Sequence, residues 1–296
     1  MKNVLRNQLL SRAILELYFT AKTPVHVGSG QEGTLNLIAR FPVNGSLTPI
    51  IPSESLKGTL RYLASTISKS MNFNQDTKKA VELHRKDTHI PEDSQYRSSL
   101  INNYKDKSRN FLENEGILNK KQLEELSDKD VADLYFSLNC PICSLFGSKS
   151  LAGKINVLDM TPVQDASIVT YTSASILRKT LTVKEGSLYT VEAVSPNAIF
   201  RTKIIVDNVL NKSDEARVLA NALLYIKEKG LVVGGLKSRG YGLLELDANH
   251  SGVKVLKFNS NPKSSEDVVS NISALLLKEE YYEYLTIDKY LEALTK

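Results

Sequence analysis

The sequence predicts an α+β fold, and three observations support this expectation. Hydrophobic residues make up 42% of the 296-residue chain, enough for the core of one elaborated domain or two small ones. Apolar residues alternate with a period of two over residues 13–21, which is typical of a half-buried strand, and they recur at helical spacing over residues 53–67 and 214–229. Between these patterns, residues 70–135 are highly charged and have few long apolar runs, which indicates a helical insertion.

The first predicted strand, residues 13–21, places Leu15, Leu17 and Phe19 on one face. Four later segments are also expected to be strands because they are rich in β-branched residues: 154–160, 167–173, 188–194 and 200–206. Together with the two helical patterns, this order of elements is that of a ferredoxin-like core that carries a large insertion.

A helix is expected after Pro52, with Ser53 as its N-cap. Its core-facing stripe recurs at helical spacing and consists of Leu56, Leu60, Leu63 and Ile67. Lys57 and Arg61 are four residues apart and share another face. We interpret them either as a solvated basic edge or as a contact to backbone phosphates.

Residues 176–187 predict a protruding β-hairpin between two of the strands. The hairpin carries Arg178, Lys179 and Lys184 against a single acidic residue, so we expect a basic finger here. Further along, residues 214–229 predict an amphipathic helix that ends at Gly230.

The C-terminal tail, residues 259–296, is expected to be helical. It begins with a Ser/Asn-rich linker and continues with a helical pattern through residues 274–277. We interpret its cluster of Tyr281, Tyr282 and Tyr284 as helix packing rather than as a base-stacking surface.

Charge and cysteine content narrow the class of protein. The 38 basic and 33 acidic side chains give a net charge of +5, which permits a nucleic-acid partner without requiring one. The two cysteines are three residues apart, unlike those of a secreted disulfide scaffold. There is no apolar region of signal-peptide length and no run of the roughly 20 apolar residues that a membrane span needs. We therefore expect a cytoplasmic protein with no membrane partner.

Residues 234–242, GGLKSRGYG, are the most informative loop of the chain. Glycines such as Gly234, Gly235 and Gly240 let a backbone approach a ligand closely. The central Lys237, Ser238 and Arg239 add charge and hydrogen-bond donors suited to phosphate. The loop lacks the ending of a Walker loop and the βαβ setting of a dinucleotide fingerprint. It predicts a nucleic-acid or nucleotide cradle, with a purely structural glycine turn as the alternative.

Cys140 and Cys143 have the spacing of half a tetrahedral zinc site. His84 and His89, two of the four histidines, lie in the insertion and are candidates for the other two ligands. The sequence therefore predicts a structural Zn²⁺. Two neighbouring buried thiols without a metal are the alternative.

Four segments, in this order, resemble the RAMP superfamily of CRISPR-associated proteins, and within it the backbone subunits of type III interference complexes. They are TPVHVGSG at 23–30, IPSESLKGTLR at 51–61, CPICSLFGS at 140–148 and GGLKSRGYG at 234–242. The resemblance implies a RAMP core with an RRM-like fold, formed by residues 1–69 and 136–258, that polymerises along a guide RNA. It also implies that the hairpin is the family's thumb, which wedges into the guide–target duplex and displaces base pairs at regular intervals.

The implied partners are a CRISPR guide RNA, its target RNA, and other subunits of a type III effector ribonucleoprotein for antiviral defence, including like subunits. The expected RNA-binding residues lie in the four segments, in the loop after the first strand and in the hairpin. They are His26, Ser29, Arg40, Ser53, Ser55, Lys57, Arg61, Arg178, Lys179, Lys184, Gly234, Gly235, Lys237, Ser238, Arg239 and Gly240.

One departure from the family pattern bears on catalysis. Backbone subunits that cut target RNA resemble one another in an acidic residue two positions before a Pro-Val pair, and here Arg40 occupies that position. Because an arginine cannot hold a metal ion, we expect an RNA-binding subunit without its own cleavage activity and name no catalytic residue. Two enzymatic alternatives stay open: a guide-RNA-processing endoribonuclease with His26 as general base, and target cleavage through another carboxylate such as Glu32. We expect His26 to pack beneath the glycine-rich loop.

Overall fold

The computed structural model describes residues 9–43, 45–85, 88–177, 179–184, 186–257 and 282–296. This part of the chain contains three β-sheets and eight α-helices, so the α+β class expected from the sequence is confirmed. In these residues no helix is both long enough and apolar enough to cross a membrane.

Strand β1 (Ser11–Ala21) is the centre of the largest sheet. Its side chains alternate between buried and half-buried, as the period of two predicts, and Leu15, Leu17 and Phe19 are almost wholly enclosed. It pairs antiparallel with β10 (Ile199–Asp207) on one side. The strand order is β11-β12-β1-β10-β6, with β11 at Leu231–Val232, β12 at Leu243–Leu246 and β6 at Ile155–Val157. Three further strands extend it: β7 (Thr161–Pro162) pairs with β10, and β13 (Gly252–Lys257) pairs with β1 and β14 (Tyr282–Leu285).

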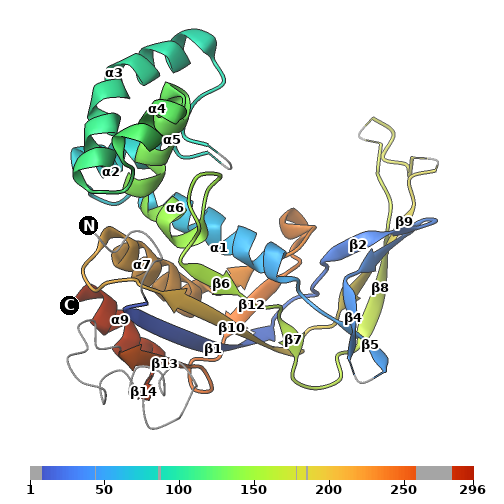
Figure 1. Ribbon diagram of the computed structural model, residues 1–296. Coiled ribbons are helices and arrows are strands. Elements are labelled where there is room, and N and C mark those ends of the chain that lie inside the picture. The colour runs from blue at the N-terminus through green and yellow to red at the C-terminus, as the bar shows by residue number, and fades with distance from the viewer. Residues whose placement is uncertain (1–8, 44, 86–87, 178, 185, 258–281) are drawn as a thin grey trace.

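Helices α1 (Ser53–Ser68) and α7 (Asp214–Lys229) contact each other on one face of this sheet (Figure 1). Helix α7 begins and ends as predicted, and its C-cap is Gly230. The start of α1 differs from the expectation, because the N-cap is Pro52 and not Ser53. Instead of a capping side chain from the helix itself, the carboxylate of Asp159 accepts a 2.6 Å hydrogen bond from the Ser53 backbone N–H.

The insertion is helical, as expected, and forms the upper lobe in Figure 1. Leu112, Leu123 and Val131 form a small core of its own, while Tyr135 and Phe136 join it to the main core. Its helices, with the short helix that follows, are α2 (Gln75–Leu83), α3 (Ser94–Asn114), α4 (Lys120–Glu125), α5 (Asp128–Asn139) and α6 (Pro141–Phe146).

A second sheet projects from the opposite end of the molecule (Figure 1). Its order is β2-β3-β9-β8, with β2 at Gly28–Glu32, β3 at Leu35–Ile38, β9 at Tyr189–Val194 and β8 at Ile168–Ser173. A separate ribbon of β4 (Arg40–Val43) and β5 (Ser46–Pro49) lies beside it. Strands β8 and β9 pair antiparallel and carry the predicted hairpin, residues 176–187, at their tip. Within it, Ile176 and Val183 form an isolated bridge, and Lys179 and Lys184 are exposed.

The described part of the C-terminal tail differs from the expected helix packing of its tyrosines. Tyr282 and Tyr284 lie on β14, which pairs antiparallel with β13, and a helix, α9 (Ile287–Thr295), follows. Strand β13 pairs with β1 along one edge and, along the other, forms backbone hydrogen bonds with β14. Local spacing of the tyrosines does not reveal such a pairing. Tyr281 and the helical pattern at 274–277 lie outside the described residues.

Candidate metal centre and nucleic-acid interface

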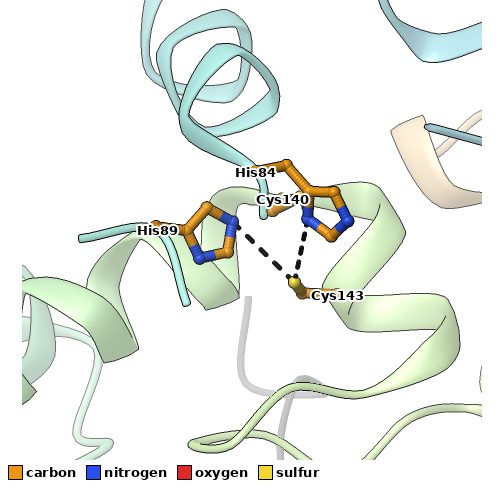
Figure 2. Close-up of side chains that lie close together, drawn as sticks. All are labelled: His84, His89, Cys140 and Cys143. Carbon is orange, nitrogen blue, oxygen red and sulfur yellow. Dashed lines mark hydrogen bonds between the residues drawn. The ribbon is translucent and has the colours of Figure 1, made fainter. Parts of the chain in front are cut away.

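The four predicted metal ligands converge at the junction of the insertion and the main core (Figure 2). His84 directly follows α2, Cys140 links α5 to α6, and Cys143 lies within α6. The ligand atoms of these residues and of His89 all lie within 4.8 Å of one another. The sequence prediction of a four-residue cluster is therefore confirmed, including the two ligands from the insertion.

The spacing of the ligand atoms suits tetrahedral coordination. His84 Nδ1 lies 3.6 Å from Cys140 Sγ and 3.4 Å from Cys143 Sγ, and His89 Nε2 lies 3.8 Å from Cys143 Sγ. Bonds of about 2.3 Å to sulfur and about 2.0 Å to nitrogen at tetrahedral angles place neighbouring ligand atoms about 3.5 Å apart. The four side chains could thus hold a metal ion between them.

The two thiols shift each other's pKa in opposite directions. Burial raises the pKa of Cys140, but hydrogen bonds with Cys143, His84 and His89 outweigh burial and leave that pKa well below its usual value. The pKa of Cys143 is raised, first by its hydrogen bond to Cys140 and then by burial. The two thiols thus oppose each other, because the contact between them lowers the pKa of Cys140 and raises that of Cys143. A divalent cation would remove this opposition, because its charge favours two thiolates.

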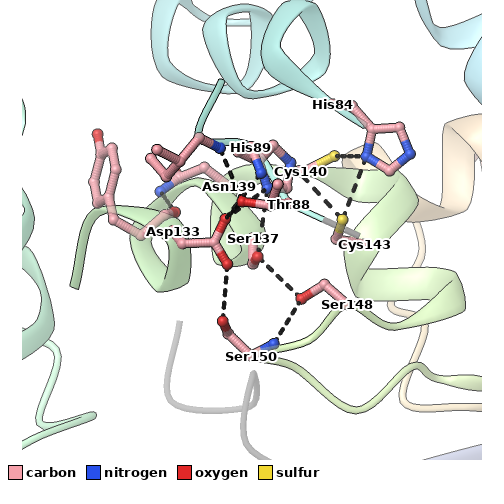
Figure 3. A network of polar contacts seen from close by, with 12 residues as sticks. His84, Thr88, His89, Asp133, Ser137, Asn139, Cys140, Cys143, Ser148 and Ser150 are labelled. Carbon is pink, nitrogen blue, oxygen red and sulfur yellow. Dashed lines mark hydrogen bonds and ion pairs between the residues drawn. The ribbon is translucent and has the colours of Figure 1, made fainter. Parts of the chain in front are cut away.

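A network of polar side chains lies next to the cluster, on the side of His89 (Figure 3). The buried carboxylate of Asp133 accepts hydrogen bonds of 2.8 Å from the backbone N–H of His89 and 2.8 Å from the hydroxyl of Thr88. Its other oxygen accepts a 2.9 Å bond from Ser150. His89 Nδ1 lies 3.5 Å from the Ser137 hydroxyl and 3.9 Å from Asp133. The ring is therefore held with Nε2 toward the cysteines.

Arg61 connects this cluster to α1. Its guanidinium donates a 2.9 Å hydrogen bond to the carbonyl of Gly147 and lies 3.9 Å from Cys143 Sγ. The side chain expected to face RNA from α1 is thus engaged with the loop after α6. Lys57 is half-buried on the same helix and has a partner of its own.

The glycine-rich loop is anchored on the segment that follows β1. The Gly235 N–H donates a 2.8 Å hydrogen bond to the carbonyl of His26. Gly234 has φ +76°, and a Cβ there would lie 2.2 Å from that same carbonyl oxygen, so no other residue fits. A single 3-10 turn, Lys237–Arg239, forms the tip of the loop and exposes all three of its residues.

A groove of about 380 Å³ separates this loop from α1. Helix α1 lines it with Glu54, Ser55, Gly58, Thr59 and Tyr62, and the loop lines it with Gly234, Gly235 and Lys237. Of the predicted RNA-binding residues, the structure thus brings Ser55, Gly234, Gly235 and Lys237 together. Arg239 faces another way, with its guanidinium 5.5 Å from the centre of the Tyr189 ring.

His26 lies beneath the loop, as expected. It is 8% exposed, and its Nδ1 is 2.7 Å from the carbonyl of Glu192 on β9. The carboxylate of Glu192 forms a 2.8 Å ion pair with Arg40 and accepts a hydrogen bond from the Ile38 N–H. Arg40 is therefore paired with a carboxylate from a strand that is distant in the sequence.

The other predicted contacts are spread over the molecule. Ser29 on β2 donates a hydrogen bond to the carbonyl of Ile38, and Ser53 lies at the start of α1. Lys179 and Lys184 lie in the hairpin, Ser238 and Gly240 lie at the tip of the loop, and Arg178 is outside the described residues.

Several lining residues were not singled out from the sequence. Tyr62 is 75% exposed and shares its face of α1 with Ser55 and Thr59, a pattern of threes and fours that the sequence contains. Glu192, in contrast, has no local signal, because its partners are more than 150 residues away.

The profile of the RAMP superfamily matches residues 18–245, a span that includes the end of β1, the cysteine pair and the glycine-rich loop. The chain belongs to the RAMP superfamily. Among solved structures, this RAMP protein is similar to a chain in the cryo-EM structure of the type III-B Cmr-beta bound to cognate target RNA, with 16% sequence identity and a TM-score of 0.42. The match covers 83% of this chain and 61% of that chain. No curated protein matches the sequence.

Proposed function

We propose that this RAMP protein is a guide-RNA-binding subunit of a type III CRISPR effector ribonucleoprotein. The observation that carries the proposal is the groove between α1 and the glycine-rich loop, which is lined by two of the segments that resemble the type III backbone subunits. Its partners would be the guide RNA, the target RNA and other subunits of the complex, including like subunits.

In this proposal, the large sheet and its two helices form the ferredoxin-like or RRM-like core. The order β12-β1-β10-β6, with antiparallel neighbours and crossovers through α1 and α7, supports this assignment. Residues 1–69 and 136–258 would form the RAMP core, 70–135 the insertion and 259–296 the tail. The hairpin at 176–187 would be the thumb, and its position at the tip of β8 and β9 supports that role (Figure 1).

The groove offers both the charge and the hydrogen-bonding groups that an RNA backbone needs. The Lys237 ammonium suits phosphate oxygens, while the Ser55 hydroxyl can donate or accept a hydrogen bond. Glu54 would repel a phosphate but can accept a hydrogen bond from a ribose 2′-hydroxyl, a group that DNA lacks. Contacts of this kind read backbone and shape rather than base sequence.

We further propose that the subunit binds the target without cutting it. The ion pair between Arg40 and Glu192 supports this, because a carboxylate held by a guanidinium is a poor ligand for a catalytic cation. The burial of His26 beneath the loop argues against its use as a general base for guide processing. Glu32, which is exposed at the end of β2, is the carboxylate to test as an alternative.

For the four-residue cluster we propose a structural Zn²⁺. Two thiolates and two imidazoles are a typical ligand set for structural zinc, and four protein ligands would fill a tetrahedral coordination shell.

Binding is tested by measuring the affinity of the chain for single-stranded RNA across a salt series. Lys237→Ala should weaken binding and reduce the slope of log affinity against log salt, because one phosphate contact is lost. Lys120→Ala, which removes an exposed lysine from the insertion, is the matched control and should change neither quantity. Equal behaviour of the two variants would remove the groove from the RNA path.

Cleavage is tested separately with the assembled complex, labelled target RNA and Mg²⁺. We expect no difference between complexes that contain the wild-type subunit and those that contain Glu32→Ala or His26→Ala. Loss of periodic cutting in the Glu32→Ala complex would show that this subunit is a nuclease.

A further inference from the structure

Three tyrosines gather next to the tip of the glycine-rich loop. The rings of Tyr171 on β8 and Tyr241 in the loop meet edge to face, with centroids 5.6 Å apart and an interplanar angle of 81°. The Arg239 guanidinium lies 5.5 Å from the centroid of the Tyr189 ring on β9. In the β8–β9 register, Tyr171 pairs with Val191 and Ser173 with Tyr189. Tyr171 and Tyr189 therefore point to the same face.

This cluster of Tyr171, Tyr189, Tyr241 and Arg239 is open to solvent on one side. Tyr171 is 36% exposed, Arg239 is exposed, and the other two rings are half-buried. A strand residue that served only packing would be expected to bury its ring. Flat aromatic faces beside a guanidinium plane are the surfaces on which unpaired bases stack.

The cluster lies directly beyond the groove. Lys237 lines the groove, while Arg239, two residues later in the same 3-10 turn, faces the tyrosines. A strand whose phosphates pass Lys237 reaches the cluster by crossing that single turn.

We propose that the tyrosine–arginine cluster is a stacking site for one unpaired base of the RNA whose backbone lies in the groove. The inference rests on the proposed RNA-binding function and adds a contact to a base where the groove contacts only the backbone. The site would take any base, because every base has a stacking face.

The test compares two single-stranded RNAs of equal length, one intact and one abasic throughout, on the full chain. Tyr171→Thr removes the ring but keeps a residue suited to a strand, and Tyr171→Phe keeps the ring without its hydroxyl. We expect Tyr171→Thr to bind intact RNA about tenfold more weakly and abasic RNA as tightly as the wild type does. Tyr171→Phe should bind both RNAs like the wild type.

Lys237→Ala separates this inference from the proposed function, since it should weaken binding of both RNAs equally. If Lys237→Ala weakens binding but Tyr171→Thr leaves intact RNA unaffected, the stacking site is overturned and the RNA-binding function stands. An equal loss by Tyr171→Thr on intact and abasic RNA also overturns the stacking site, because it indicates a disturbed fold. If the wild type binds neither RNA, both proposals fail.

Discussion

Asp133 is a single residue on which much of the metal cluster depends. It is 5% exposed, and its carboxylate accepts hydrogen bonds from the Thr88 hydroxyl, the His89 N–H and the Ser150 hydroxyl. Asp133→Ala would leave the buried His89 N–H and the half-buried Thr88 hydroxyl without this acceptor. We expect the free energy of unfolding to fall by about 3 kcal/mol and metal affinity to fall by about 10- to 100-fold, measured by urea denaturation and by competition with a chromogenic chelator.

Asp130→Ala on the same helix provides the control. Asp130 is exposed and bonds the hydroxyl of Ser127 at the N-terminus of α5, so its loss should cost less than about 1 kcal/mol. Metal affinity should be unchanged. If both variants bind metal equally well, Asp133 does not position the ligand.

Some residues of the candidate sites could be predicted from the sequence and others could not. The four-residue cluster was predictable, because the two cysteines have Cys-x-x-Cys spacing and two of the four histidines lie close to each other in the sequence. The ion pair of Arg40 with Glu192 was not predictable from the sequence. Arg40 lies on β4, just after β3, and Glu192 lies on β9, and the two residues come together because β3 pairs with β9. That Arg40 stands in the place of an acidic residue stays a prediction, whereas its ion pair with Glu192 is seen in the structure.

At the scale of elements, the glycine-rich loop keeps its shape through close backbone contact. Gly234 and Gly240 both have positive φ, of 76° and 81°, but only at Gly234 would a Cβ meet a neighbour, the carbonyl oxygen of His26. We expect Gly234→Ala to cost about 3 kcal/mol, from strain and overlap together. Gly240→Ala should cost about 1 kcal/mol, from strain alone. Thermal denaturation of the two variants measures the difference, and equal losses would show that the contact with His26 is unimportant.

A second link between elements is titratable. Glu215 at the start of α7 accepts hydrogen bonds of 2.8 Å from Ser144 on α6 and 3.2 Å from Lys154 before β6. Burial raises the pKa of Glu215, but the charge of Lys154 and the Ser144 hydroxyl outweigh it, so the pKa is lowered overall. A carboxyl group with a lowered folded-state pKa stabilises the fold above its unfolded pKa of about 4.3. This stabilisation is lost as the pH falls through the folded-state value.

Glu215→Gln should therefore lower the free energy of unfolding by about 2 kcal/mol at pH 7, because Lys154 loses its charged partner. The gap to the wild type should narrow as the pH falls below about 4. Urea denaturation at a series of pH values measures this, with the exposed Glu228→Gln on the same helix as control. A gap that is constant with pH would mean that the hydrogen bonds, and not the charge, link α6 to α7.

Elements with strong periodicity were predictable from the sequence, and pairings between distant elements were not. The patterns of β1, α1 and α7 predicted their extents closely, since each buries one regular face. The prediction that Tyr282 and Tyr284 pack on a helix was wrong, because the four-residue strand β14 takes its conformation from pairing with β13 rather than from local spacing. The face of α1 that lines the groove was also not predicted. The expectation rested on the charged residues Lys57 and Arg61, whereas the groove is lined by the uncharged Ser55, Thr59 and Tyr62.

In the whole molecule, the four-residue cluster lies where the helical insertion meets the main core. The small core of Leu112, Leu123 and Val131 belongs to the insertion alone, while α6 packs on α1 and α7. Ligands from the end of α2 and from α6 tie these regions together. Apolar contacts also hold the insertion to the rest, because Val81, Leu83, Ile90, Tyr135 and Phe136 belong to the main core.

Removal of the metal should therefore loosen one part of the molecule and spare the other. We expect chelation to lower the melting temperature by about 10 °C and to speed hydrogen exchange in α2, α5 and α6. Exchange in β1 and β10 should hardly change, because these strands are buried at the centre of the large sheet. Cys143→Ser should show the same pattern before chelation and no further change after it. Uniform acceleration of exchange in all elements would instead mean that the cluster stabilises a single cooperative fold.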